Sequence, residues 1–187
     1  MIYMIRHGQT ELNSRQVLQG RSNFPLNETG ILQAEDAAAR LKGIPFSAVY
    51  SSPLVRALQT AEIVAPGIEV HVDERLIEMD YGPYEGADLK RLPPEVISFF
   101  SDFVHNPSPE GMESLESVVQ RAGAFLENCC RTGETILIST HAIALKGLLE
   151  YLAPDADGAW WSKYIGNCAV YTTEYHDGHF AAPMELK

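Results

Sequence analysis

Short apolar runs alternate with segments of helical periodicity along this chain, and this alternation constrains the fold more than any other feature. The runs at residues 1–5 (MIYMI) and 135–140 (TILIST) carry no charged side chain. Runs of this kind are typical of strands that are covered on both faces of a sheet. Strands that alternate with helices favour a three-layer α/β/α sandwich around a mostly parallel sheet.

Helix and turn signals separate these runs. Asn27 is a candidate N-cap and Gly43 a stop for a helix in 26–43. Ser52 is expected to cap a second helix, with Pro53 as its first residue. Further helices are predicted within 113–129 and 142–152, strands at 48–52 and 68–76, and a terminal hairpin in 167–182 with its turn at Asp177 and Gly178.

The length of 187 residues suits one domain, so we predict a single domain over 1–187. Between residues 82 and 111 the helical pattern gives way to five prolines and several aromatic residues. We interpret this stretch as a small lid insertion with short helical pieces, because a second domain needs a longer chain of its own.

The charge balance argues against several classes of partner. With 14 Lys and Arg against 25 Asp and Glu, the formal net charge is −11, which disfavours binding to nucleic acid or to an anionic membrane. No apolar run approaches the roughly 20 residues of a membrane span, and the N-terminal run is too short for a signal peptide. We therefore expect a cytoplasmic protein. Nothing in the sequence indicates its oligomeric state.

The cysteines do not indicate a disulfide framework or a metal site. They number three, two of them adjacent, and no Cys/His pair has ligand spacing. We expect small buried side chains in a reducing compartment. The alternative is a metal site built from His176 and His179. These two residues, together with His71 and His105, are more typical of exposed surface positions.

Two predicted strands end at a histidine, and this pattern points to a site. Because the carboxyl ends of parallel strands meet at one sheet edge, His7 and His141 are expected to lie close together. Arg56 falls in the first turn of a predicted helix, where free N–H groups suit a phosphate, and Arg6 adds a second guanidinium. The sequence therefore predicts a pocket for a phosphoryl group.

An ordered set of motifs supports this prediction. The stretches RHGQTELN (6–13), SSPLVRALQTAE (51–62) and LIEMDYGPYEG (76–86), followed by a strand that ends at His141, span most of the chain. A lone RHG would recur by chance, but the whole set resembles the histidine phosphatase superfamily, which has the phosphoglycerate-mutase-like fold. Within it, the chain is similar to the broad-specificity or α-ribazole phosphatase branch.

The resemblance implies catalytic roles for five residues. His7 matches the nucleophile that becomes phosphohistidine, and Glu78 matches the general acid that later activates water. Arg6, Arg56 and His141 match the groups that stabilise charge on the phosphoryl oxygens. Each has a structural alternative, such as a satisfied histidine at a strand end or a solvated helix arginine. Glu74, Asp80 and Glu85 crowd the stretch around Glu78 and are the residues most easily confused with it.

Four further residues are expected to contact the substrate. Asn13 and Gln19 match polar positions near the phosphate, although backbone hydrogen bonding is the ordinary role of such loop residues. Gly8 allows a close backbone approach, and its carbonyl can fix the imidazole tautomer. Ala142 departs from the glycine common in the family after the second histidine, which implies reduced room rather than lost activity. Lys146 and Trp160-Trp161 are interpreted as helix-solvating and packing residues.

The resemblance implies a phosphomonoesterase that needs no cofactor or metal and acts on a small phosphorylated metabolite. A mutase must exclude water from its phosphoenzyme, whereas the insertion here is short, which favours hydrolysis. Its aromatic residues would suit an apolar leaving group, or would simply pack against the core. The alternatives are phosphoglycerate-mutase-type transfer and a non-catalytic module that binds phosphorylated ligands. The presence of all five catalytic matches argues against the latter.

Overall fold

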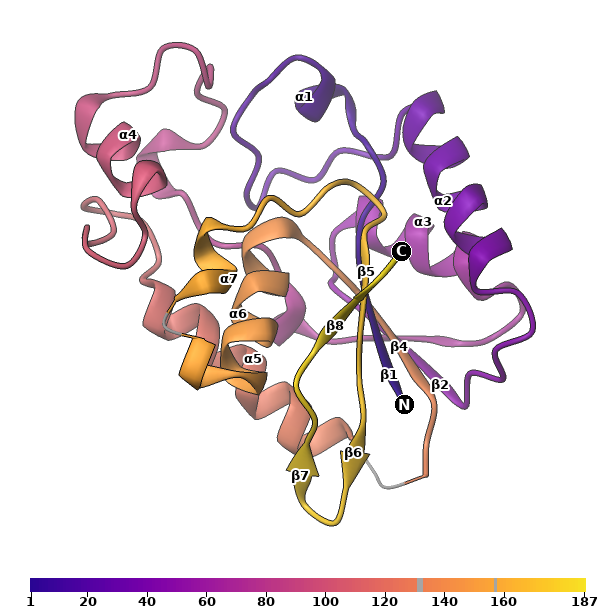
Figure 1. Ribbon diagram of the computed structural model, residues 1–187. Coiled ribbons are helices and arrows are strands. Elements are labelled where there is room, and N and C mark those ends of the chain that lie inside the picture. Colours follow the sequence, from indigo (N-terminus) through magenta and orange to yellow (C-terminus); the bar gives the residue numbers. More distant parts are fainter. Residues whose placement is uncertain (131–132, 157) are drawn as a thin grey trace.

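A computed structural model describes residues 1–130, 133–156 and 158–187. Its centre is a six-stranded sheet with the order β3-β2-β4-β1-β5-β8 (Figure 1). The strands on the β3 side of β1 pair in parallel, whereas β5 and β8 run antiparallel to their neighbours. The sheet is thus mixed but mostly parallel, as the alternation predicted. Its strands are β1 (Ile2–Arg6), β2 (Ala48–Ser51), β3 (Val70–Val72), β4 (Ile136–Thr140), β5 (Val170–Thr173) and β8 (Met184–Leu186).

Helices cover both faces of this sheet and make the predicted three layers (Figure 1). On one face, α2 (Glu28–Arg40) and α3 (Val55–Val64) share a core with strand residues Val49 and Leu137. On the other, α5 (Leu115–Cys129) and α6 (Ala142–Leu152) share a core with Met4 and Ile138. Alternate residues of β4 therefore face opposite layers, and the continuous apolar run of that strand follows from its burial on both sides.

The register of the two central strands positions the site. β1 pairs with β4 so that Arg6 lies opposite Thr140, the last residue of each strand. His7 and His141 are the next residues, and the His7 N–H still donates to the Thr140 carbonyl at 2.9 Å. Two residues 134 positions apart in the sequence are thus brought to one sheet edge by the pairing of their strands.

The helix start signals were right in one case and wrong in the other. Asn27 caps α2, since its side chain accepts a hydrogen bond from the Gly30 N–H. By contrast, α3 begins only at Val55, so Ser52 is not its N-cap and Pro53 is not helical. The Ser52 hydroxyl lies 2.7 Å from Nε2 of His141, and Leu54 remains extended before the helix starts. The Ser52 hydroxyl also accepts the Leu54 N–H at 3.3 Å, so it joins a local turn before the helix to a contact distant in sequence.

The remaining elements are short. The predicted strand at 68–76 is β3 followed by the 3₁₀ turn η1 (Glu74–Leu76), and the hairpin turns at Asp177 and Gly178 as expected, with φ of 49° and 85°. Within the described residues, no helix has both the length and the apolar character that a membrane crossing requires. The other elements are α1 (Glu11–Ser14), η2 (Gly82–Tyr84), α4 (Pro94–Ser101), η3 (Pro154–Ala156), α7 (Ala159–Ser162), β6 (Tyr175–His176) and β7 (His179–Phe180).

The stretch at 82–111 contains η2 and α4, joined by irregular chain (Figure 1). Its apolar residues pack inward: Phe99 is fully buried in a cluster with Tyr81, Val118 and Trp161. Phe103 stacks edge-on to Phe99 with ring centroids 4.9 Å apart. These contacts show that the aromatic residues of this stretch anchor it to the core, which was one of the two interpretations open from the sequence.

Candidate active site

His7 stands at the carboxyl end of β1 with a defined tautomer. Its Nδ1 lies 2.6 Å from the carbonyl of Gly8, and a carbonyl can only accept a hydrogen bond, so Nδ1 carries the proton. Nε2 is then the unprotonated nitrogen, and the Nε of Arg56 donates to it over 3.2 Å. The ring is almost fully buried. The geometry presents the lone pair of Nε2 beside a guanidinium, as a nucleophile for an anionic centre requires.

Arg56 contacts both histidines and also a separate loop. Its Nε also lies 3.2 Å from Nδ1 of His141, and its two terminal nitrogens donate to the carbonyls of Ser22 and Gly20 at 2.7 and 2.6 Å. The side chain is 0% exposed, which is rare for an arginine. Because backbone carbonyls on a separate loop fix its far end, the guanidinium is held in place before any ligand arrives.

His141 faces His7 from the end of β4. The two ring centroids are 5.1 Å apart, and the residue is the N-cap of α6. Its Nε2 contacts the Ser52 hydroxyl at 2.7 Å. Both histidines, Arg56 and the N-terminal end of α6 therefore converge, and the strand-end pattern predicted the meeting of the two histidines.

The electrostatic surroundings keep both imidazoles neutral. Burial lowers the pKa of His7 well below its ordinary value, and the charges of Arg56 and Arg6 lower it further. Burial also lowers the pKa of His141, with Arg56 as the largest charge contribution. Burial brings the pKa of Arg56 itself down to about 10, which leaves it charged at neutral pH. A neutral nucleophile beside a permanent cation is the state that attack on a phosphate needs.

Arg6 supplies the second guanidinium. One terminal nitrogen donates to the Ile165 carbonyl at 2.6 Å, while its Nε is buried without a partner among the described residues. Burial lowers the pKa of Arg6, and the charge of Glu78 opposes that shift. Unused donors on a half-buried cation are suited to an anionic ligand.

Glu78 lies at the start of α6. Its Oε1 accepts hydrogen bonds from the N–H groups of Met79 and Ala144 at 2.9 Å, and its Oε2 accepts from Ile143 at 3.2 Å. The residue is almost fully buried. The helix that is capped by His141 therefore also holds this carboxylate, through the N–H groups of its first turn.

The neighbouring acidic residues lie elsewhere. Glu74 is exposed, and Asp80 forms an ion pair with Arg21 at 3.1 Å. Glu85 accepts hydrogen bonds from the N–H groups of residues 20–22 and so fixes the loop whose carbonyls hold Arg56. Of the four candidates, only Glu78 accepts from the N–H groups at the start of α6.

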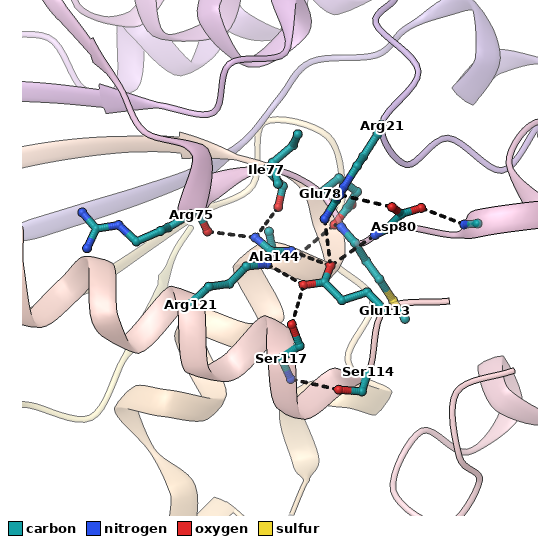
Figure 2. A network of polar contacts seen from close by, with 12 residues as sticks. Arg21, Arg75, Ile77, Glu78, Asp80, Glu113, Ser114, Ser117, Arg121 and Ala144 are labelled. Atoms are coloured by element: carbon teal, nitrogen blue, oxygen red, sulfur yellow. Dashed lines mark hydrogen bonds and ion pairs between the residues drawn. The ribbon is translucent and has the colours of Figure 1, made fainter. Parts of the chain in front are cut away.

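A polar network behind Glu78 fixes the chain segment that carries it (Figure 2). Arg121 donates to the carbonyls of Arg75 and Ile77 at 2.8 and 2.6 Å, and its Nε pairs with Glu113 at 2.8 Å. Glu113 also receives the Asp80 N–H and a contact from Arg21. The backbone on either side of Glu78 is thus tied to α5.

Asn13 and Gln19 form part of a hydrogen-bonded loop next to His7. Thr10 donates its hydroxyl to Oε1 of Gln19 at 2.6 Å, and Asn167 donates both to the His7 carbonyl at 3.0 Å and to Oδ1 of Asn13. Nε2 of Gln19 is buried and has no partner among the described residues. This buried amide is a donor that a ligand could use.

Gly8 and Ala142 occupy tight positions for different reasons. A Cβ on Gly8 would lie 2.4 Å from the carbonyl oxygen of Gly30, so the loop after β1 touches the first turn of α2. The Gly8 N–H donates to the Thr60 hydroxyl at 3.1 Å. Ala142 is the half-buried first residue of α6. The close approach expected of Gly8 is thus made to protein backbone.

Several residues around the site were not identified from the sequence. Thr60 and Ser52 lie within the motif that pointed to Arg56, yet spacing gave no reason to link them to Gly8 or His141. Asn167 comes from a distant loop and had no signal. Lys146 is buried, so its interpretation as a helix-solvating residue was wrong.

The other chemistry-bearing residues lie outside this cluster. His71, His105, His176 and His179 are exposed, as expected. Trp161 is buried and packs near Phe103. In the described part of the chain, no group of three or more His, Cys, Asp or Glu side chains is arranged to hold a metal ion.

Comparison with known proteins gives a family match over nearly the whole chain. The family model described as histidine phosphatase superfamily (branch 1) matches residues 2–184. Among curated relatives, the probable phosphoglycerate mutase GpmB of Yersinia pestis is 32% identical over 189 residues, which cover 97% of this chain and 87% of the relative.

Solved structures of similar fold cover nearly the whole chain. YhfR of Bacillus stearothermophilus superposes with a TM-score of 0.85 at 32% identity, covering 97% of this chain and 94% of the other. The phosphoserine phosphatase of Entamoeba histolytica, solved with phosphoserine, gives 0.84 at 29% identity, covering 100% and 94%. A mycobacterial glucosyl-3-phosphoglycerate phosphatase gives 0.84 at 26% identity, covering 96% and 95%.

Proposed function

Because the chain belongs to branch 1 of the histidine phosphatase superfamily, we propose that it hydrolyses a small phosphorylated metabolite through a phosphohistidine at His7. The observation that carries the proposal is the contact of Arg56 with Nε2 of His7 at 3.2 Å. It joins a fixed cation to the unprotonated nitrogen of a buried imidazole, which is the pairing that attack on an anionic phosphate needs.

In the first half of the reaction, Nε2 of His7 attacks phosphorus and the bond to the leaving oxygen breaks. The carboxyl group of Glu78, protonated at this stage, gives its proton to that oxygen. Arg6, Arg56 and His141 bind the three non-bridging oxygens, where negative charge is spread in the transition state. The products are the free alcohol and a phosphohistidine, with the carboxylate of Glu78 now ionised.

In the second half, water attacks the phosphohistidine. Glu78 takes a proton from the water, the N–P bond breaks, and inorganic phosphate leaves with His7 and Glu78 restored. Hydrogen bonds from the first turn of α6 hold the Glu78 carboxylate in place for this base step. No step needs a metal or cofactor, so we expect full activity in EDTA. Inhibition by the chelator would redirect attention to His176 and His179.

Phosphoglycerate-mutase-type transfer is the second candidate, favoured by the resemblance to GpmB. The two reactions share the phosphoenzyme and differ in the acceptor, which is water in one and a phosphoglycerate in the other. Phosphatases among the relatives of similar fold and length favour water. The same relatives favour a small phosphorylated metabolite as substrate.

A quench experiment separates these candidates. The enzyme is mixed with p-nitrophenyl phosphate, stopped in alkali because histidine phosphates are acid-labile, and the peptide containing His7 is analysed by mass. We expect a phosphoryl group on His7 that decays to inorganic phosphate in water. An adduct that persists until 3-phosphoglycerate is added would instead support the mutase. With neither adduct nor turnover, a binding module would replace both.

A further inference from the structure

A cavity of about 440 Å³ opens beside the phosphate pocket and has no role in the steps above. Its walls come from the end of α4 and the chain after it, from α7 and the loop that follows it, and from one residue of α6. Its volume lies within the range of small-molecule sites. The lining is aromatic on one side (Phe100, Phe103, Trp161) and carries one inward cation, Lys146.

Lys146 is a buried ammonium without an ionic partner. The residue is 8% exposed, and Nζ donates to the Trp161 carbonyl and lies 5.0 Å from the centre of the Phe103 ring. Among the described residues, no carboxylate comes within ion-pair distance of it. An ammonium has three donors, so two remain for a ligand.

The other charged groups on the cavity wall are already engaged. Lys163 pairs with Glu185 at 2.8 Å. The carboxylate of Asp102 contacts His105 at 2.8 Å and accepts backbone N–H groups from its own turn. The Tyr164 side chain is largely exposed at the rim. Lys146 is therefore the charged group in the lining without a counter-charge in the described chain.

Leaving such a group unpaired is unfavourable. Burial lowers the pKa of Lys146 to about 8, with the charge of Glu78 opposing the shift and that of Arg6 adding to it. The amine is still mainly protonated at neutral pH. A buried charge without a partner destabilises a protein, and an anionic ligand at this position would relieve that cost.

The cavity is connected to the phosphate pocket by two elements. On α6, Lys146 lies one turn after Ala142 and on the same helix face, and helix side chains lean toward the N-terminus, where His141 and Glu78 lie. On the other wall, Tyr164 is followed directly by Ile165, whose carbonyl binds Arg6, and then by Asn167, which binds the His7 carbonyl. Both walls of the cavity thus continue into segments that contact the groups of the phosphate pocket.

We propose that this cavity holds the non-reacting part of the substrate and that Lys146 binds a carboxylate there. The inference rests on the proposed function and narrows its substrate class to short phosphomonoesters that carry a carboxylate. The aromatic wall contacts the carbon skeleton. One ammonium with two available donors matches a single carboxylate better than a second phosphate, which has twice the charge and more acceptors.

The test compares two substrates that differ only at the proposed contact. Glycerol 3-phosphate has a CH₂OH group where 3-phosphoglycerate has its carboxylate. We expect the ratio of their kcat/KM values to favour 3-phosphoglycerate by about 10- to 100-fold, the range of a charged hydrogen bond. Lys146→Met should bring the ratio to about one, whereas Lys146→Arg should keep most of it. The ratio should fall above pH 8 in the wild type but not in Lys146→Met.

Lys163→Met is the matched control, because it removes a lysine of the same wall whose charge Glu185 already neutralises. We expect it to change the ratio by less than about twofold. Calorimetric binding of both compounds to His7→Ala protein separates the two proposals. A binding preference that Lys146→Met abolishes, without turnover by the wild type, would overturn hydrolysis and keep the subsite. Turnover without the preference, or a preference that survives in Lys146→Met, would overturn the subsite alone.

Discussion

The phosphate pocket and the neighbouring cavity are built in opposite ways. In the pocket, Arg56 and Glu78 are each fixed by at least three hydrogen bonds, mostly to backbone atoms. In the cavity, aromatic side chains pack against one another, and the single inward cation has one hydrogen bond. The pocket lies on strand ends and helix starts, whereas the cavity is lined partly by the irregular chain that follows α4 and α7.

We infer from this difference that the pocket carries out the catalytic step and that the cavity sets the substrate specificity. Groups held by backbone on regular elements keep their geometry whatever the substrate carries, as a shared catalytic step requires. Side chains on connecting segments can change without disturbing the sheet, and such segments commonly set specificity. For substrates with the same kind of leaving group, substitutions in the pocket should therefore have equal effects, whereas substitutions in the cavity should have unequal ones.

The largest effect is expected for His7→Ala, which removes the nucleophile. We expect kcat/KM to fall by at least about 10⁴-fold for every phosphomonoester, because the variant lacks the nitrogen that forms the covalent intermediate. Steady-state phosphate release measures this. Thermal unfolding of the variant should remain cooperative and close to that of the wild type. Substantial residual activity in a folded His7→Ala protein would contradict the mechanism.

The next effect is expected for Glu78→Gln, which keeps the shape of the side chain and removes its proton transfer. We expect a loss of about 10²–10⁴-fold for alkyl phosphates, whose leaving group needs protonation. The loss should be much smaller for p-nitrophenyl phosphate, since its leaving group departs as an anion. Asp80→Asn is the matched control, because that carboxylate is half exposed and pairs with Arg21. Equal losses for both leaving groups would argue against Glu78 as the acid.

A moderate effect is expected for Glu113→Gln in the network behind Glu78 (Figure 2). It weakens the hold on Arg121, which fixes the backbone around Glu78, so kcat should fall by several-fold with all substrates alike. The free energy of unfolding should fall by about 1–3 kcal/mol. Chemical denaturation measures the stability. A substrate-dependent change in kcat would place Glu113 with the cavity instead.

The stability change of Glu113→Gln should also depend on pH. Burial alone would raise the pKa of Glu113, but hydrogen bonds and charge from Arg121 outweigh it and hold the pKa below its ordinary value. A lowered folded-state pKa stabilises the protein above the unfolded-state pKa, about 4.3, and this contribution is lost as the pH falls through the folded-state value. The difference between variant and wild type should therefore shrink below about pH 4. A difference that grows in acid would contradict this assignment.

The smallest effect is expected for Phe103→Leu in the cavity. It removes the ring beside Nζ of Lys146 and keeps an apolar side chain, so we expect kcat/KM for 3-phosphoglycerate to fall by about two- to fivefold, the range of an exposed cation–π contact. The value for glycerol 3-phosphate should change less. A uniform loss for both substrates would mean that the cavity and the pocket are not separate in function.

Local patterns in the sequence predicted most of the framework. Apolar runs and helical spacing gave the layers, and the strand-end rule brought His7 and His141 together because a sheet edge is a consequence of topology. The start of α3 was misplaced by two residues: the helix begins at Val55, and the hydroxyl of Ser52, which accepts the Leu54 N–H, also contacts a histidine 89 positions away. Capping preferences reflect contacts between residues close in the sequence. They carry no information about a distant partner such as His141.

What the sequence determined by itself is the chemistry available: two histidines and two arginines placed after strands or at a helix start, with an acidic stretch between them. What only the tertiary structure decided is how those groups are held. The hydrogen bonds from α6 that set Glu78 apart from its acidic neighbours, the carbonyls that fix Arg56 and the burial of Lys146 all depend on segments distant in the chain. Hydrogen bonds and desolvation depend on atoms that lie within a few ångströms of one another. The separation of two residues along the sequence does not tell whether they lie that close in the fold.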